Sequence, residues 1–170
     1  MSVDREALSR ALVEAVGRAG VMYSDAIGPA YYEDISHERS GAPWLVLRPA
    51  TTAEVAACLR LCHRFGQPVV PQGGMTGIVS AGTPADGEIA LSTQRLARTE
   101  EVDRASATIT AQAGVTLQQV QEEAEQAGFF FPLDIGSRGS CTVGGNVSTN
   151  AGGNRVLRYG MMRDLVVGLE

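Results

Sequence analysis

The sequence predicts an α+β fold. Two patterns support this class: a strand–helix–strand unit between residues 44 and 71, and two short strands followed by a helix between residues 98 and 127. A strand–helix–strand unit of about thirty residues normally contains two parallel strands joined by a right-handed crossover. We therefore expect helices and strands to pack together throughout the chain.

The composition narrows the possible functions. The chain has 170 residues, 44% of them apolar, and a net charge of -5 without a Lys/Arg cluster, so nucleic acid is not an expected partner. No apolar run approaches the ~20 residues needed to span a bilayer. The charged N-terminus does not resemble a secretory signal. We expect a cytoplasmic protein, with peripheral association with a membrane as an open alternative.

The first helix is expected over residues 3–18. Its apolar positions recur at helical spacing and are Ala7, Leu8, Ala11, Leu12, Ala15 and Val16. Ser2 is the expected N-cap, and Gly17 follows the last apolar position. A short strand is expected next, at residues 21–23.

The strand–helix–strand unit begins with a strand at residues 44–47. Thr51 and Glu54 have the spacing of a capping box, which predicts a helix that ends at Gly66. The second strand is expected at residues 67–71. Such units place their carboxyl-terminal loops at one edge of a sheet.

The rest of the chain alternates in the same way. Strands are predicted at residues 88–92, 98–103, 108–113 and 164–169, a capped helix at 116–127, a buried run at 129–131 and a short helix at 142–150. In the helix at 116–127, Thr116 and Gln119 have capping-box spacing.

The candidate metal ligands in the sequence are Cys58, Cys62 and His63. Cys58 and Cys62 are four residues apart on a predicted helix, and His63 points to another side of it. A zinc site needs more ligands at suitable spacing. We interpret the cysteines as small buried apolar residues and expect no metal site.

Two glycine-rich stretches are candidate ligand loops, at residues 71–77 and 132–160. Glycine allows close approach of the backbone to a ligand, and Ser, Thr and Asn add short hydrogen-bonding groups. The first stretch follows a strand but matches neither the Rossmann fingerprint nor the Walker A loop. Main-chain amides that bind phosphate are one interpretation, and plain tight turns are the other.

Taken together, these stretches resemble the FAD-linked oxidase family with the vanillyl-alcohol-oxidase (PCMH-type) FAD-binding domain. The similar group within it is the D-2-hydroxyacid dehydrogenases, which includes D-lactate dehydrogenase, the glycolate oxidase FAD subunit and D-2-hydroxyglutarate dehydrogenase. Three segments carry the resemblance: Pro-Val-Val-Pro-Gln-Gly-Gly-Met-Thr-Gly, Leu-Ser-Thr-Gln-Arg-Leu, and the run from Pro-Leu-Asp-Ile-Gly-Ser to Leu-Arg-Tyr-Gly. It covers roughly residues 40–170.

The resemblance implies two α+β lobes, residues 1–83 and 84–170, with FAD between them and the second lobe truncated. It implies cofactor contacts near the pyrophosphate from Pro71, Gln72, Gly73, Gly74, Met75, Thr76 and Gly77. It implies contacts with the isoalloxazine, ribityl and ribose groups from Pro132, Gly139, Ser140, Thr142, Gly144, Gly145, Asn150 and Gly152.

The chain departs from the family pattern in its first loop, where Gln72 and Met75 replace an arginine and a glycine. Some members carry a histidine bonded to the flavin at the Met75 position, so we expect non-covalent FAD here. Members are also about three times longer. The resemblance implies that a cap domain outside these 170 residues supplies the catalytic groups, so no catalytic residue is assigned here.

The implied function is the FAD-binding portion of an enzyme that oxidises a 2-hydroxy acid by hydride transfer to FAD. The substrate would be of the D-lactate, glycolate or D-2-hydroxyglutarate type. The acceptor could be a quinone, a flavoprotein or a cytochrome. One alternative is a non-catalytic flavin-binding or self-associating module that forms homo-oligomers through an exposed strand at 164–169. Another is a flavin reductase of the cell-wall-precursor type.

Overall fold

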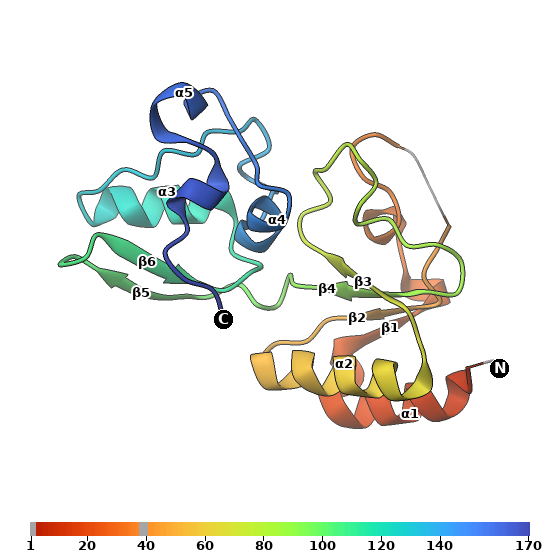
Figure 1. The fold of residues 1–170 in the computed structure, drawn as a ribbon. Helices are drawn as coiled ribbons and strands as arrows, with labels where there is room; N and C mark the ends of the chain where they lie inside the picture. Colours follow the sequence, from red (N-terminus) through yellow and green to blue (C-terminus); the bar gives the residue numbers. More distant parts are fainter. Residues whose placement is uncertain (1–2, 38–40) are drawn as a thin grey trace. The chain divides into compact units, whose positions relative to one another are not determined.

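The structure is a computed structural model that describes residues 3–37 and 41–170. The chain divides into two compact units, Met1–Arg95 and Leu96–Glu170, and each has its own cluster of buried apolar side chains (Figure 1). Each unit combines helices with strands. The α+β class that the sequence predicts is therefore present in both.

The first unit contains a four-stranded sheet and two long helices. Its elements are α1 (Arg5–Val16), η1 (Arg18–Gly20), β1 (Val21–Tyr23), η2 (Ser24–Ala26), η3 (Pro29–Tyr31), β2 (Leu45–Leu47), α2 (Thr52–Phe65), β3 (Val69–Gln72) and β4 (Ile89–Ser92). The strand order is β1-β2-β4-β3, with β1 antiparallel to β2. Both β2 and β3 pair with β4 in parallel. The predicted parallel strands are thus confirmed, but β4 lies between them.

The helices α1 and α2 lie side by side on one face of this sheet (Figure 1). Leu8 and Leu12 from α1 meet Cys58 and Cys62 from α2 in a core that also contains Ile89 from β4. Burying one large aliphatic side chain stabilises a fold by about 1.5–3 kcal/mol. Packing therefore accounts for most of the stability of these helices.

Capping residues set where the helices begin. Asp4 is the N-cap of α1, and its Oδ1 accepts a hydrogen bond from the amide of Ala7 at 3.0 Å. The predicted cap, Ser2, lies outside the described residues. At α2, Thr51 Oγ1 accepts from the amide of Glu54, as predicted, but Glu54 Oε2 accepts from the amide of Ala50 and not from that of Thr51. One half of the predicted capping box at α2 is thus present, and the return hydrogen bond to Glu54 comes from the residue before the N-cap.

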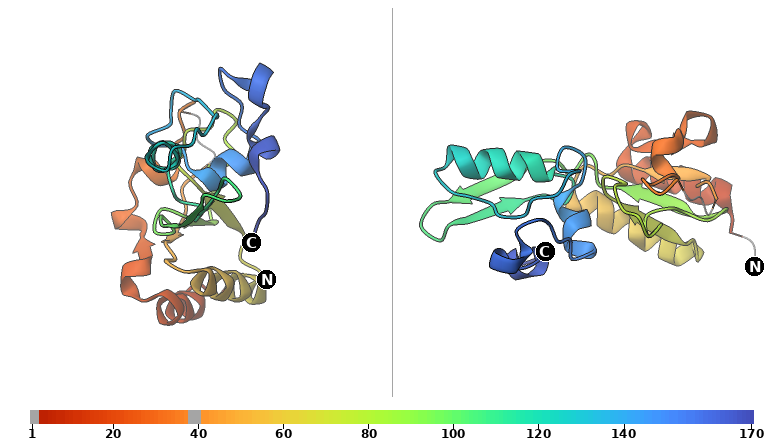
Figure 2. Two further views of the ribbon diagram at one scale, coloured as in Figure 1. Left: turned by 90° about the vertical axis from the view of Figure 1, so that its left-hand side faces the viewer. Right: turned by 90° about the horizontal axis from the view of Figure 1, so that it is seen from above.

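The second unit is built on a hairpin. Its elements are β5 (Thr99–Asp103), β6 (Thr108–Ala111), α3 (Leu117–Gln126), α4 (Val143–Ser148), α5 (Val156–Tyr159) and η4 (Met162–Leu165). Helix α3 packs along the antiparallel pair of β5 and β6 (Figure 2). The predicted capping box of Thr116 and Gln119 is confirmed. The short helix predicted within residues 142–150 is confirmed as α4.

The prediction of a strand at residues 164–169 is wrong. The chain forms η4 there because Asp164 Oδ2 accepts a hydrogen bond from the amide of Met161 at 2.8 Å and starts a helical turn. Residues 166–170 pair with no strand in the part of the chain that is described. Val167 and Leu169, which form the alternating apolar pattern, are 84% and 78% exposed. The basis for self-association through a strand edge is therefore lost.

The phenylalanine run at residues 129–131 is also less buried than predicted. Phe130 is 57% exposed, and its ring lies 5.8 Å from that of Tyr159. The guanidinium of Arg155 lies 4.9 Å from the centre of the Phe130 ring. Contacts with these two partly exposed side chains take the place of burial in a core.

The division between the units falls at Arg95/Leu96. The predicted lobe boundary at 83/84 would separate β4 from β2 and β3, with which it pairs. As a boundary between FAD-binding lobes, it stays a prediction. Strand pairing explains why the compact unit continues past it.

Candidate functional site

The first candidate site is the glycine-rich loop, residues 73–82, that leaves the carboxyl end of β3. The main-chain amides of Gly73 to Val79 make no hydrogen bond with any described residue. Backbone amides without an internal partner need water or a ligand. The loop therefore presents consecutive N–H donors that are available to a bound group.

The charge and conformation of this loop limit what it can bind. It contains no ionisable side chain, so an anion would meet oriented amide dipoles and no lysine or arginine of the loop itself. Met75 has a φ of 52°, in the left-handed region that glycine adopts most readily. Consecutive amides with a residue in this region suit the oxygens of a phosphate group. The donor set fits a pyrophosphate.

The second candidate stretch is more tightly packed. The amide of Val143 donates to the carbonyl of Val115, that of Gly144 to Ala113, and that of Gly145 to Thr142 Oγ1. These three amides are therefore unavailable to a ligand. In the described structure, the amides of Gly139, Thr142 and Gly152 have no such partner. The stretch therefore offers a few main-chain donors next to amides that are already hydrogen-bonded.

Asn150 combines an unusual backbone with an occupied side chain. Its φ is 49°, and its Oδ1 accepts a hydrogen bond from the amide of Arg163 at 2.9 Å. Its Nδ2 lies 3.7 Å from the Met161 sulfur. The Asn150 carboxamide thus ties the end of α4 to the segment that leads into η4. Its Oδ1 and Nδ2 are therefore both in contact with atoms of the chain itself.

The predicted site residues fall into two groups. Those at 71–77 lie together in the first unit, and those at 132–152 lie in the second. Of the second group, Ser140 has an exposed side chain, and Thr142 caps α4. Pro132 is half-buried and has no N–H to offer. The assignment of these residues to cofactor contacts stays a prediction.

Sequence reasoning missed the residues that support the first loop. Asp34 is buried, and its Oδ2 accepts a hydrogen bond from the amide of Ser80 at 3.0 Å. Hydrogen bonds from Ser36, first of all from its hydroxyl, lower the pKa of the Asp34 carboxyl below its usual value. Gln72 contacts the carbonyl of Tyr31. The Asp-x-Ser spacing is a known turn signal that could have revealed Asp34.

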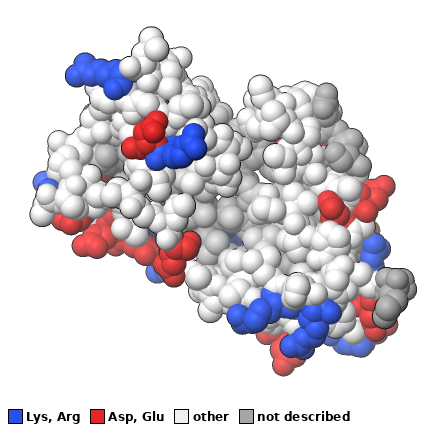
Figure 3. Space-filling view, in the orientation of Figure 1, with Lys and Arg blue, Asp and Glu red and all other residues white. Residues whose placement is uncertain are grey.

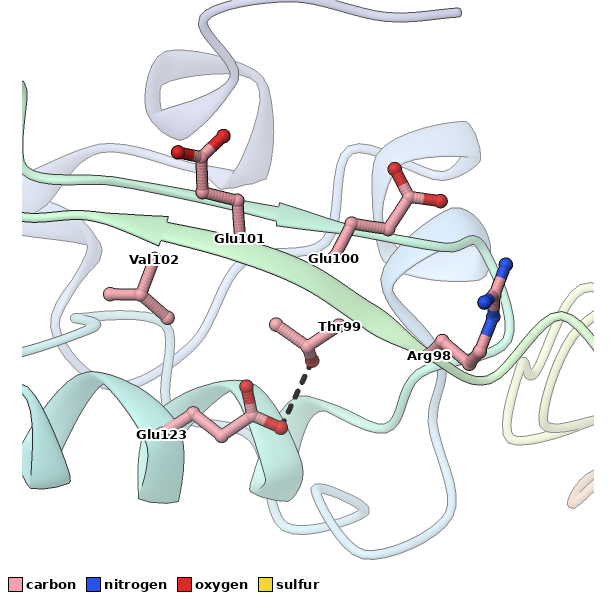
Figure 4. Close-up of a pocket in the computed structure, with 6 residues that line it drawn as sticks. All are labelled: Arg98, Thr99, Glu100, Glu101, Val102 and Glu123. Atoms are coloured by element: carbon pink, nitrogen blue, oxygen red, sulfur yellow. Dashed lines mark hydrogen bonds between the residues drawn. The ribbon is translucent and has the colours of Figure 1, made fainter.

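An open surface pocket in the second unit contains no residue of either glycine-rich stretch. It is lined by Arg98, Thr99, Glu100, Glu101, Val102 and Glu123. Figure 4 shows Glu100 and Glu101 pointing away from Glu123, whose carboxylate accepts a hydrogen bond from Thr99 Oγ1 at 3.0 Å. Acidic side chains gather over this hairpin (Figure 3). Because they do not converge, the pocket has no cation-binding geometry.

The described residues contain neither a candidate metal site nor a helix that could span a membrane. No group of three or more His, Cys, Asp or Glu side chains there could hold a metal ion. No helix in residues 3–37 and 41–170 is long and apolar enough to span a bilayer. Cys58 and Cys62 are buried, as predicted, and His63 is exposed. These cysteines belong to the core.

Comparisons with known proteins place the chain in a family. The family model described as an FAD binding domain matches residues 43–170. The mitochondrial D-2-hydroxyglutarate dehydrogenase of Bos taurus is 48% identical over 130 residues, which are 76% of this chain and 24% of that protein. The chain spans about a quarter of the length of this relative.

Solved structures share the fold at lower sequence identity. Alkyldihydroxyacetonephosphate synthase aligns with a TM-score of 0.87 and 21% identity over 98% of this chain and 33% of its own. The 6-hydroxy-D-nicotine oxidase of Arthrobacter nicotinovorans aligns with a TM-score of 0.71 and 21% identity over 85% of this chain and 31% of its own.

These matches confirm the α+β fold of the PCMH type and FAD as the cofactor. They agree with the loop at residues 73–82, whose amides suit a pyrophosphate. The chain belongs to the family of FAD-binding domains.

Proposed function

We propose that this chain is the FAD-binding part of a flavin-dependent dehydrogenase that oxidises a 2-hydroxy acid. The observation that carries the proposal is the row of unpaired amides from Gly73 to Val79, in a loop without charged side chains. The 2-hydroxy acid class is supported by the name of the Bos taurus relative, a D-2-hydroxyglutarate dehydrogenase. D-2-hydroxyglutarate is therefore the first substrate to test.

In this proposal the loop binds the pyrophosphate through its main chain. Bound FAD supplies the hydride acceptor, and the protein supplies position and electrostatics. The amides of Gly139, Thr142 and Gly152 would donate to polar atoms of the same cofactor. No described residue of this chain is assigned to proton transfer, because His63 and His37 are exposed and lie outside both stretches.

The flavin would be held without a covalent bond at position 75. The methionine thioether at this position has no N–H or O–H group and cannot replace a histidine ring as a flavin attachment point. The electron acceptor, the compartment and the oligomeric state stay predictions.

The test is reconstitution followed by reduction. The longest protein that contains this sequence is purified, loaded with FAD, and mixed anaerobically with D-2-hydroxyglutarate, D-lactate or glycolate. We expect the oxidised flavin absorbance to be bleached by at least one of them. L-2-hydroxyglutarate and L-lactate are the matched controls for the two chiral acids.

Three outcomes would overturn the proposal. A protein that binds no FAD would refute the cofactor role. A protein that binds FAD and is bleached by none of the acids would support the non-catalytic alternative. Bleaching by NADPH in place of a hydroxy acid would favour the reductase alternative.

A further inference from the structure

Gln72 connects both ends of the glycine-rich loop to a segment far away in the sequence. Its side chain is 2% exposed, and its Nε2 donates to the carbonyl of Tyr31 and to that of Gly82, each at 2.8 Å. The main-chain carbonyl of Gln72 accepts hydrogen bonds from the amide and the hydroxyl of Thr93. One buried carboxamide thus joins the last residue of β3, the end of the loop and the segment around η3.

The Gln72 side chain is fully used as a donor but not as an acceptor. Its Oε1 is buried and has no hydrogen-bond partner in the described structure. The two N–H groups of the carboxamide therefore account for its orientation. The carboxamide of this glutamine therefore faces two main-chain carbonyls of its own protein.

Asp34 makes a second connection between the same two segments. Its Oδ1 accepts from the amide of Ser36 at 2.9 Å, and its Oδ2 from the amide of Ser80 at 3.0 Å. Ser80 has a φ of 53°, which is uncommon for a residue other than glycine. Its carbonyl accepts from the amide and the hydroxyl of Thr83. The carboxylate thus holds a strained turn at the end of the loop.

The two connections leave the middle of the loop unpaired. Its ends are held at Gln72 and at Ser80–Gly82, and the amides between them have no internal partner. Holding a binding loop in its bound shape lowers the entropy lost when a ligand binds. The anchoring carbonyl and carboxylate belong to Tyr31 and Asp34, which precede the family-matched residues 43–170.

We propose that Gln72 and Asp34 are positioning residues that hold the loop at residues 73–82 in the shape that binds the FAD pyrophosphate. Segment 31–36 therefore sets the affinity for the cofactor without touching it. This inference rests on the proposed function.

The test compares two variants with a matched control. Gln72→Met keeps the length of the side chain and removes both donors. Asp34→Asn keeps Oδ1 as the acceptor for Ser36 and puts a carboxamide NH2 group, which is a donor, where the amide of Ser80 needs an acceptor. Ile35→Ala, at an exposed side chain of the same segment, is the control. Thermal unfolding followed by circular dichroism establishes that each variant is folded.

The first measurement needs no cofactor. Amide hydrogen exchange, followed by NMR, should show the Ser80 amide of the wild-type chain exchanging more slowly than those of Ile78 and Val79. Gln72→Met should raise the exchange rates of Ser80 and Thr83 at least tenfold, and Asp34→Asn that of Ser80. Ile35→Ala should leave them within twofold. Equal rates at Ser80 and Val79 in the wild type would overturn the inference even if a variant fails to fold.

The second measurement is the dissociation constant for FAD, from quenching of flavin fluorescence. We expect it to rise at least tenfold in Gln72→Met and Asp34→Asn and less than twofold in Ile35→Ala. Faster exchange with unchanged affinity would overturn the role in binding, and weaker affinity with unchanged exchange would overturn positioning. A wild-type chain that binds no FAD would refute the proposed function, while the exchange data would still decide whether these residues hold the loop.

Discussion

Gly144 and Ala113 are in main-chain contact. The Gly144 amide donates to the Ala113 carbonyl at 2.8 Å, and a Cβ placed on Gly144 would come within 2.7 Å of the Ala113 Cβ. No real side chain tolerates that approach without a shift of one backbone. The glycine at the start of α4 is therefore required for packing within the second unit.

Gly144→Ala should lower the free energy of unfolding by about 1–3 kcal/mol, because overpacking forces the backbone to move. Urea unfolding measures this change. Gly136→Ala is the control, because no atom lies within 4 Å of its added Cβ, and its effect should stay within about 0.5 kcal/mol. Equal effects of the two substitutions would contradict the packing argument.

Thr116→Ala should destabilise the second unit by about 1 kcal/mol. Thr116 Oγ1 accepts from the amide of Gln119 at 3.2 Å, and Gln119 Oε1 accepts from the amide of Thr116 at 3.0 Å. Thr116→Ser retains the hydroxyl and should recover most of the loss. Thermal unfolding of both variants checks this, and an equal loss in the two would show that the hydroxyl does not cap α3.

Alkaline pH should destabilise the first unit through its buried thiols. Burial raises the pKa of Cys58 to about 12 and that of Cys62 to about 11, from an ordinary value of 9.0. An unfolded chain loses these protons near pH 9, whereas the folded chain retains them. The stability is thus fully present below pH 9 and is lost as the pH rises toward 12.

The measurement is the free energy of unfolding in urea between pH 8 and pH 11, under reducing conditions. The control is the double variant Cys58→Ala/Cys62→Ala, whose stability is lower overall but should fall less steeply above pH 9. Parallel curves for the two proteins would show that the thiols do not contribute to the slope.

Acid precipitation of the FAD-loaded protein should release all flavin into the supernatant. Position 75 holds a methionine, which provides no attachment point for the flavin ring. The absorbance of the supernatant and of the redissolved pellet measures the partition. Flavin retained in the pellet would contradict non-covalent binding.

Much of the local structure followed from short-range patterns. The capping box of Thr116 and Gln119 and the end of α2 at Gly66 depend on residues within one or two helical turns of each other, so spacing alone was sufficient. The wrong prediction of a strand at residues 164–169 concerned a feature that depends on distant residues. An alternating apolar pattern makes a strand only where another strand offers hydrogen bonds, and none does so in the described residues.

The sequence by itself determined the α+β class, the two glycine-rich stretches and their likeness to FAD-binding proteins, because each depends on neighbouring residues. Tertiary structure decided that β4 lies between β2 and β3 and that Tyr31 and Asp34 hold the loop after β3. These contacts join residues about 20 to 46 positions apart. They form only when the chain packs into a common core, and no local pattern encodes which distant partners will meet there.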